Sequence, residues 1–143
     1  MSAPYPETLC GEVLMRLAPD ARHEAICNRL HACIHASVAN LSSTRLLPPR
    51  SRVQVSRDTI LCPDLTLVTV PHGKAWLAAE IIYSGDNRPD TVIKKQIYEE
   101  LRIPRLWMID PRYDNVEIYQ TDPYGLCLKE ILAGAQVLSE KLI

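Results

Sequence analysis

The stretch that decides the fold is Pro63-Asp64-Leu65-Thr66-Leu67-Val68-Thr69-Val70, followed by Pro71-His72-Gly73-Lys74 and then by Ala75-Trp76-Leu77-Ala78-Ala79-Glu80-Ile81-Ile82. The first and last segments are short, apolar and rich in β-branched residues, and turn-forming residues separate them. This pattern predicts a β-hairpin. If the hairpin turns at His72-Gly73, Asp64 lies opposite Glu80 or one residue away from it.

Asp64 and Glu80 would then bring two carboxylates together inside apolar strands. Opposed residues of an antiparallel pair have Cβ atoms roughly 4.5–5.5 Å apart, and two carboxylates at that distance repel each other and are costly to desolvate. A divalent cation removes this cost, and Mg²⁺ is commonly held by one or two carboxylates with water and phosphate oxygens. We interpret the pair as half of a site for Mg²⁺ or Mn²⁺. For Asp64 taken alone, a polar residue at a strand start is the alternative.

A lysine on the following helix is the third candidate. Asp90, Lys94 and Tyr98 are spaced four residues apart and therefore share one helical face. If this helix packs over the hairpin, the Lys94 ammonium reaches the two acids. Lys94 is preferred to the adjacent Lys95 because it keeps this spacing, and an exposed ion pair with Asp90 is the alternative for it. Tyr98 is a packing residue with a hydroxyl partner in the simpler interpretation.

The remaining pattern predicts the order of the other elements. Apolar residues recur at helical spacing from about Ala21 to Leu41, with Asp20 as a candidate N-cap and His23 on the core-facing side. The strands are expected at 11–17, 52–55, 63–70, 75–83 and 105–109, and a final hairpin pairs 116–119 with 126–131. A loop is expected at 42–49. A second helix is expected to be capped by Asp86 or Asn87 and to end near Arg102. The tail from Leu132 is expected to be weakly helical or irregular. A strand, a helix and a strand joined by short loops predict a parallel crossover.

This order is a helix, three antiparallel strands, a helix and a parallel strand, with an added C-terminal hairpin. We therefore predict an α/β (α+β) fold with a mixed central sheet flanked by helices, and this is also the element order of the restriction-endonuclease-like core implied by the resemblance described next. The 143 residues are enough for one domain, 1–143.

The candidate residues resemble those of the Uma-type family of restriction-endonuclease-like proteins in the PD-(D/E)XK nuclease superfamily. The resemblance extends from about Gly11 to Ile131. One position departs from the superfamily motif, because Ile82 stands where the motif has a lysine; the related family carries its lysine on the helix, which matches Lys94. The resemblance rests on Gly11-Glu12, His23, Ile26, Leu30, Pro63-Asp64, Ala79-Glu80-Ile81-Ile82, Ser84, Asp90, Lys94, Tyr98 and Ile103-Pro104-Arg105-Leu106-Trp107-Met108-Ile109-Asp110-Pro111.

The resemblance implies a metal-dependent DNA endonuclease. Asp64 and Glu80, with a backbone carbonyl near Ile81, would hold Mg²⁺ or Mn²⁺, and Lys94 would orient the attacking water or stabilise charge on the phosphate. His23 and Tyr98 would be auxiliary residues; for His23, binding metal or phosphate, orienting a carboxylate and serving as a satisfied core histidine all stay open.

Two other classes of function remain as alternatives. One is a catalytically inactive member of the superfamily that binds DNA or a protein. The other is a dimeric scaffold, which would expose a large apolar patch on the hairpin of 116–119 and 126–131; a homodimer is compatible with either class.

The net charge of −1 argues against a general nucleic-acid coat protein, although a nuclease needs only a local basic surface. Arg45, Arg50, Arg52 and Arg57 cluster around a loop and a strand start. We expect Arg50, Arg52 and Lys95 as candidate DNA contacts, and a solvated loop is the simpler interpretation of the cluster.

Other chemistries are disfavoured. His23, Cys27, His31 and His35 step by four along the first helix, but a straight helix drifts about 40° at each step, so the four side chains cannot converge on one zinc ion. No cysteine has the spacing of a Cys/His hydrolase, and no Gly-rich phosphate loop is present. The five cysteines, without a Cys-x-x-Cys pair, favour reduced thiols and a cytoplasmic location. No membrane helix or signal peptide is expected.

Overall fold

The computed structural model describes residues 3–83 and 89–133. Ser84, the expected caps Asp86 and Asn87 and the tail at 134–143 lie outside the described residues, as does the Asp90 side chain.

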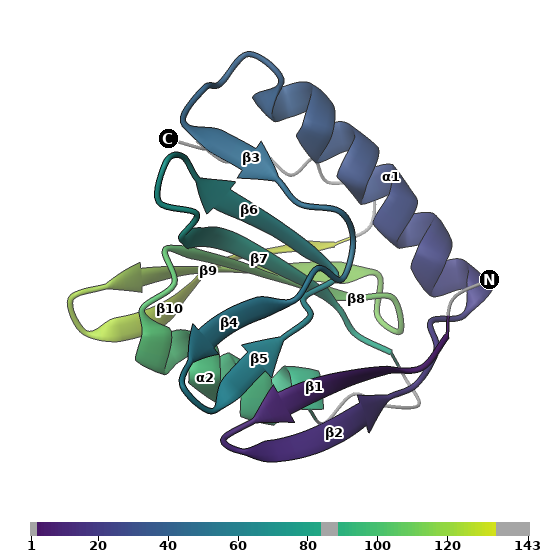
Figure 1. Ribbon diagram of the computed structural model, residues 1–143. Coiled ribbons are helices and arrows are strands. Elements are labelled where there is room, and N and C mark those ends of the chain that lie inside the picture. The colour runs from purple at the N-terminus through teal and green to yellow at the C-terminus, as the bar shows by residue number, and fades with distance from the viewer. Residues whose placement is uncertain (1–2, 84–88, 134–143) are drawn as a thin grey trace.

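The large sheet forms the centre of the molecule (Figure 1). Within the described residues it has six strands in the order β10-β9-β8-β7-β6-β3. β7 and β8 are parallel, and every other neighbouring pair is antiparallel. The strands are β3 (Thr44–Leu46), β6 (Leu65–Thr69), β7 (Ala75–Ile81), β8 (Arg105–Asp110), β9 (Asn115–Asp122) and β10 (Gly125–Ala133).

A smaller sheet lies beside it and carries the N-terminal hairpin. Its order is β2-β1-β5-β4, with β1 (Tyr5–Leu9), β2 (Glu12–Arg16), β4 (Val53–Ser56) and β5 (Thr59–Leu61). β1 and β2 pair from Tyr5 opposite Arg16 to Leu9 opposite Glu12. Cys10 and Gly11 make the turn with positive φ angles of 52° and 86°, a conformation that favours glycine.

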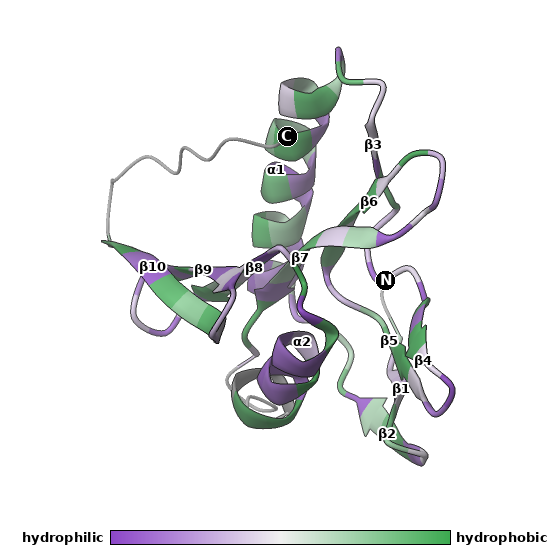
Figure 2. Ribbon diagram, turned by 90° about the vertical axis from the view of Figure 1, so that its left-hand side faces the viewer, coloured by the Kyte–Doolittle hydropathy of each residue, from purple (hydrophilic) through white to green (hydrophobic). Residues whose placement is uncertain are grey.

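The helices cover opposite faces of the large sheet, as Figure 2 shows. α1 (Ala21–Val38) begins as expected at Asp20, whose side chain accepts a hydrogen bond from the His23 N–H at 2.8 Å. The second helix begins as the π-helical segment η1 (Pro89–Lys94) and continues as α2 (Lys95–Leu101). Arg102 ends α2 in a left-handed conformation, with φ of 56°.

Side-chain alternation on β6 and β7 divides the core into two clusters, because successive residues of a strand point to opposite faces. One cluster packs between the large sheet and α1. The other packs between the opposite face of the sheet and the helix α2. The α1 cluster comprises Cys27, Ile34, Val38, Leu65, Leu67, Leu77, Ala79, Ile81, Trp107, Ile118 and Leu132. The α2 cluster comprises Leu9, Leu61, Ala78, Ile82, Ile97, Tyr98, Ile103, Leu106, Met108 and Tyr119.

The predicted fold class is confirmed, with its parallel crossover and C-terminal hairpin, but one strand assignment was wrong. The strand at 52–55 pairs with β5 in the small sheet, whereas the segment 44–46, expected in a loop, forms β3 beside β6. Three strands, β1, β3 and β5, had not been predicted. β3 and β5 are three residues long, too short for a periodic signal, and their pairing depends on partners distant in sequence.

None of the described helices is long and apolar enough to cross a membrane.

Candidate active site

Asp64 directly precedes β6, and its side chain is 3 % exposed. Oδ2 accepts the Ile81 N–H at 2.8 Å, while Oδ1 lies 3.3 Å from His23 Nε2 and 3.2 Å from Arg50 Nη1. Burial alone would raise the pKa of this carboxyl, but His23, the Ile81 N–H and the charge of Lys94 together outweigh burial and lower the pKa. Asp64 is therefore a buried carboxylate held ionised by its partners.

His23 reaches Asp64 from the first turn of α1. Its Nε2 also lies 3.1 Å from the Ile81 carbonyl oxygen, and because both neighbours are acceptors we assign the proton to Nε2. Burial lowers the pKa of the imidazole, but Asp64 outweighs burial and the pKa is raised. The predicted orientation of His23 toward the core is confirmed, and its contact is with the carboxylate.

Arg50 supports the same carboxylate from the loop before β4. Its guanidinium bridges Asp64 and Glu24, with Nη2 2.7 Å from Glu24 Oε1. Its own N–H bonds to the Asp64 carbonyl oxygen at 3.1 Å, and its φ is 56°. Arg50 was expected to contact DNA, and in the structure it forms an ion pair with Asp64.

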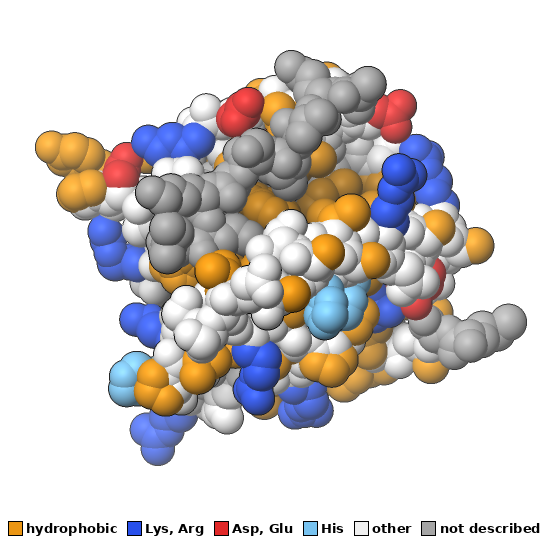
Figure 3. Space-filling model, turned by 90° about the horizontal axis from the view of Figure 1, so that it is seen from above, with side chains coloured by type: hydrophobic (Ala, Val, Ile, Leu, Met, Phe, Trp, Pro, Cys, Tyr) orange, Lys and Arg blue, Asp and Glu red, His pale blue; other side chains and the backbone are white. Residues whose placement is uncertain are grey.

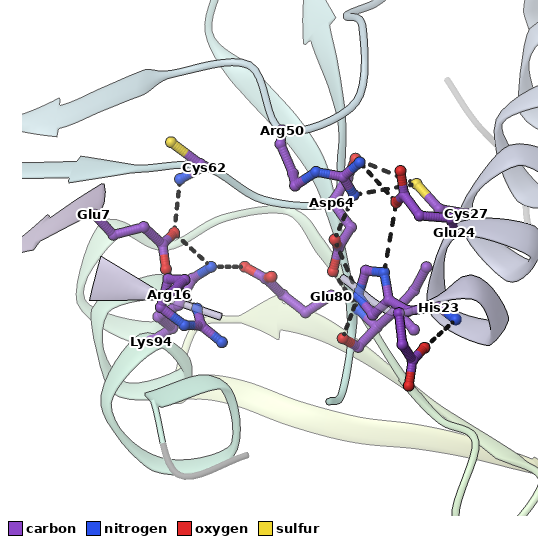
Figure 4. Close-up of polar contacts among 12 residues, drawn as sticks. Glu7, Arg16, His23, Glu24, Cys27, Arg50, Cys62, Asp64, Glu80 and Lys94 are labelled. Carbon is purple, nitrogen blue, oxygen red and sulfur yellow. Dashed lines mark hydrogen bonds and ion pairs between the residues drawn. The ribbon is translucent and has the colours of Figure 1, made fainter. Parts of the chain in front are cut away.

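Glu80 and Lys94 form the second half of the site (Figure 4). Lys94 Nζ lies 2.5 Å from Glu80 Oε2, and the Lys94 side chain is fully buried. The Tyr98 hydroxyl donates to the same oxygen at 2.5 Å. The helix therefore packs as the spacing of Lys94 and Tyr98 suggested. Lys95 instead donates to the Tyr119 hydroxyl at 2.8 Å and lies over its ring.

The N-terminal hairpin supplies a further acid, Glu7, that the sequence did not single out. Glu7 Oε2 lies 2.8 Å from Lys94 Nζ and accepts the Cys62 N–H at 2.7 Å, and Glu7 Oε1 lies 2.5 Å from Arg16 Nη1. Burial raises the pKa of Glu7, but Lys94 outweighs it and the pKa is lowered. The half-buried Tyr5 has a raised pKa, from burial first and Asp64 second. In the sequence, the alternation of Tyr5 and Glu7 along one strand was the only signal that could have pointed to Glu7.

The predicted register of the central hairpin is confirmed. Leu65 pairs with Ala79, so the next position along the strands sets Asp64 against Glu80. The two carboxylates nevertheless turn to different partners, Asp64 to His23 and Arg50, and Glu80 to Lys94 and Tyr98. Two charge clusters meet at this end of the hairpin.

The oxygen atoms at the junction are of the chemical type that a hard divalent cation takes. Within residues 3–83 and 89–133, no group of three or more His, Cys, Asp and Glu side chains is arranged to hold a metal. Asp64 Oδ1 and the Ile81 carbonyl oxygen nevertheless converge on one ring nitrogen, His23 Nε2, and Glu80 is the residue before Ile81. Carboxylate and carbonyl oxygens are the ligands that Mg²⁺ and Mn²⁺ take. In this conformation Arg50 and Lys94 provide positive charge, and His23 adds to it when it is protonated.

Basic side chains are scattered over the face seen from above. Figure 3 shows Lys and Arg side chains spread around that face rather than gathered in one patch. Arg52 is exposed, Arg50 is held by Asp64 and Glu24, and Lys95 by Tyr119. The DNA contacts expected of these three residues stay a prediction.

A mixed sheet flanked by helices, with an Asp, a Glu and a lysine gathered at the end of its central hairpin, defines a restriction-endonuclease-like protein. The chain belongs to the Uma2 family, whose model carries the description "Putative restriction endonuclease" and matches residues 5–143.

The fold is also that of a solved structure, "a putative nuclease belonging to DUF820 from Anabaena variabilis ATCC 29413". The two share 17 % sequence identity with a TM-score of 0.78, over 97 % of this chain and 82 % of that one. No curated protein matches the chain.

Proposed function

We propose that this protein is an endonuclease that hydrolyses DNA phosphodiester bonds with Mg²⁺ or Mn²⁺. The observation that carries the proposal is the burial of Lys94 against Glu80, in register with Asp64, at one end of the central hairpin. Burying these charges is costly, and a structural role does not require an acid, a second acid and a lysine at adjacent positions. Membership of the family supports the same chemistry.

Each residue would have a separate role. Asp64, Glu80 and the Ile81 carbonyl would hold the ion, which would lower the pKa of a bound water and neutralise charge on the phosphate. Lys94 would stabilise the negative charge that develops on the phosphate or orient the attacking water. Tyr98 keeps Glu80 in place through its hydroxyl, and His23 does so for Asp64.

Access to Lys94 requires a change at the N-terminal hairpin. Lys94 is fully buried, and one of its two carboxylate partners is Glu7 from β1. A DNA phosphate would replace Glu7 as the partner of Lys94, so we assign Glu7 the role of holding the lysine in the resting protein.

One observation favours the second candidate, a DNA-binding or protein-interaction module without hydrolysis. Both acids already have cationic partners, Asp64 in His23 and Arg50, and Glu80 in Lys94. A module of this kind would keep the acids for stability and would gain nothing from a divalent ion.

The test is nicking of supercoiled plasmid by the purified protein with Mg²⁺ or Mn²⁺. The variants are Glu80→Gln, Lys94→Met and the matched control Lys95→Met, each first shown to be folded by circular dichroism. Nicking that requires the metal, is lost in the first two variants and survives in the control is the expected result. Nicking that persists in Glu80→Gln would reject the site, and no nicking on supercoiled, linear or single-stranded DNA would favour the non-catalytic module.

A further inference from the structure

A pocket outside the charged site opens between the two sheets and the end of α2. Its volume is about 180 Å³, and its walls come from β4, β5, β6, β7 and the segment 101–104. Most of the lining is apolar, for example Val53, Val55, Leu61, Ala78, Leu101 and Ile103.

Among the described residues, one buried polar atom of this lining has no hydrogen-bond partner. Thr66 lines the pocket and is only 2 % exposed, and its hydroxyl makes no hydrogen bond within residues 3–83 and 89–133. Thr66 alternates on β6 with Leu65 and Leu67, which pack toward α1, so its side chain lies on the pocket side. Buried hydroxyls are normally satisfied. A ligand with a hydrogen-bonding group would give the Thr66 hydroxyl a partner.

The charged residues that line the pocket favour an anionic ligand. Lys74 and Arg102 belong to the lining and are exposed, and no acidic residue lines the pocket within the described part of the chain. Arg102 uses one guanidinium nitrogen, Nη2, to bond the Asp122 carbonyl oxygen at 2.8 Å. An anionic group at the solvent-exposed side would therefore meet two cations.

We propose that the pocket binds a compact aromatic carboxylate that carries a hydrogen-bonding group at the end opposite its carboxylate. A dry cavity of about 150 Å³ is large enough for benzene, so a volume of about 180 Å³ suits one substituted six-membered ring. The carboxylate pairs with Lys74 and Arg102, the ring packs on the aliphatic walls, and the polar end meets the Thr66 hydroxyl.

The pocket is a different site from the proposed metal site, and the proposal does not rest on nuclease activity. Tyr98 nevertheless connects the two, because it lines the pocket while its hydroxyl holds Glu80. An occupied pocket places a ligand against the residue that positions Glu80.

The experiment measures the affinity of the full chain for three probes by calorimetry and ligand-detected NMR. The probes are 4-hydroxybenzoate, benzoate, which lacks the polar end, and 4-hydroxybenzyl alcohol, which lacks the charge. We expect 4-hydroxybenzoate to bind several-fold more tightly than either of the others.

Variants test which residues cause the preference for 4-hydroxybenzoate. Thr66→Val should remove the advantage of 4-hydroxybenzoate over benzoate, while Lys74→Gln combined with Arg102→Gln should remove its advantage over the alcohol. Thr44→Val is the matched control, because Thr44 also carries a buried hydroxyl without a partner among the described residues but does not line the pocket. Absence of binding at millimolar probe, equal affinity for all three probes, or an equal loss in Thr44→Val would overturn the proposal.

Discussion

Glu7 Oε2 and Lys94 Nζ lie 2.8 Å apart, which joins the first strand of the chain to the end of η1. Lys94 is thereby held between Glu7 and Glu80, and all three side chains are at most 2 % exposed. The interior of the protein contains an ion-pair network that ties the N-terminal hairpin to the large sheet.

Removing the cation from this network should be strongly destabilising. Lys94→Met leaves Glu7 and Glu80 buried without their shared partner, and loss of one member of a buried ion pair costs about 3–5 kcal/mol. Urea unfolding should show this loss, and Lys95→Met should cost much less because Lys95 pairs with Tyr119 at a half-buried position. Adding Glu80→Gln to Lys94→Met should restore part of the stability. Equal effects at Lys94 and Lys95 would contradict the network.

The His23–Asp64 pair predicts a pH-dependent contribution to stability. Because the pKa of His23 is raised above its usual value of 6.5, its contribution is fully present below that value and is lost as the pH rises through the folded pKa. The destabilisation caused by His23→Gln should therefore be largest at mildly acidic pH and should shrink on the alkaline side. Unfolding measured across this range tests the sign, with His72→Gln at the exposed turn as control.

Cysteine reactivity should separate the buried thiols from the exposed ones. Burial first and Asp64 second raise the pKa of Cys27 to about 11, and Cys27 is fully buried. Iodoacetamide at neutral pH, followed by mass spectrometry, should label the exposed Cys10 and Cys33 while leaving Cys27 intact. Rapid labelling of Cys27 in the native protein would show that the contact between α1 and the loop of Arg50 opens.

The N-cap of α1 should have a measurable effect on stability. Asp20 accepts the His23 N–H at 2.8 Å, and replacing such a cap by alanine typically costs about 1 kcal/mol. Asp20→Ala should lower the free energy of unfolding by this amount, and Asp20→Ser, which keeps a capping oxygen, should recover most of it. An Asp20→Ala protein as stable as the parent would show that solvent satisfies the N–H equally well.

The central hairpin could be predicted from the sequence because its information is local. A turn at 71–74 between two apolar runs fixes which residues face each other, and Asp64 and Glu80 follow from that register. The position of Lys94 followed from helical spacing once the helix was assumed to pack on the sheet. These are short-range patterns that one sequence contains.

The partners of the site residues were harder to predict because they depend on packing between distant segments. Glu7 lies on β1, which pairs with the distant β5, and Arg50 meets Asp64 from a loop that also contacts Glu24 of α1. The sequence predicted Asp64 and Glu80 as one pair, whereas in the structure each turns to its own cation. The choice of rotamer for a buried carboxylate is set by these distant donors, which leave no periodic signal.

The contact between Glu7 and Lys94 also orders events during protein synthesis. A ribosome releases Glu7 and Glu80 before Lys94, so the nascent chain exposes these two acids before the buried cation that pairs with both has been made. Until η1 has left the exit tunnel, the N-terminal hairpin lacks the ion pair between Glu7 and Lys94. A DNA-cleaving activity built on these residues would consequently be unavailable to a truncated translation product that stops before this lysine.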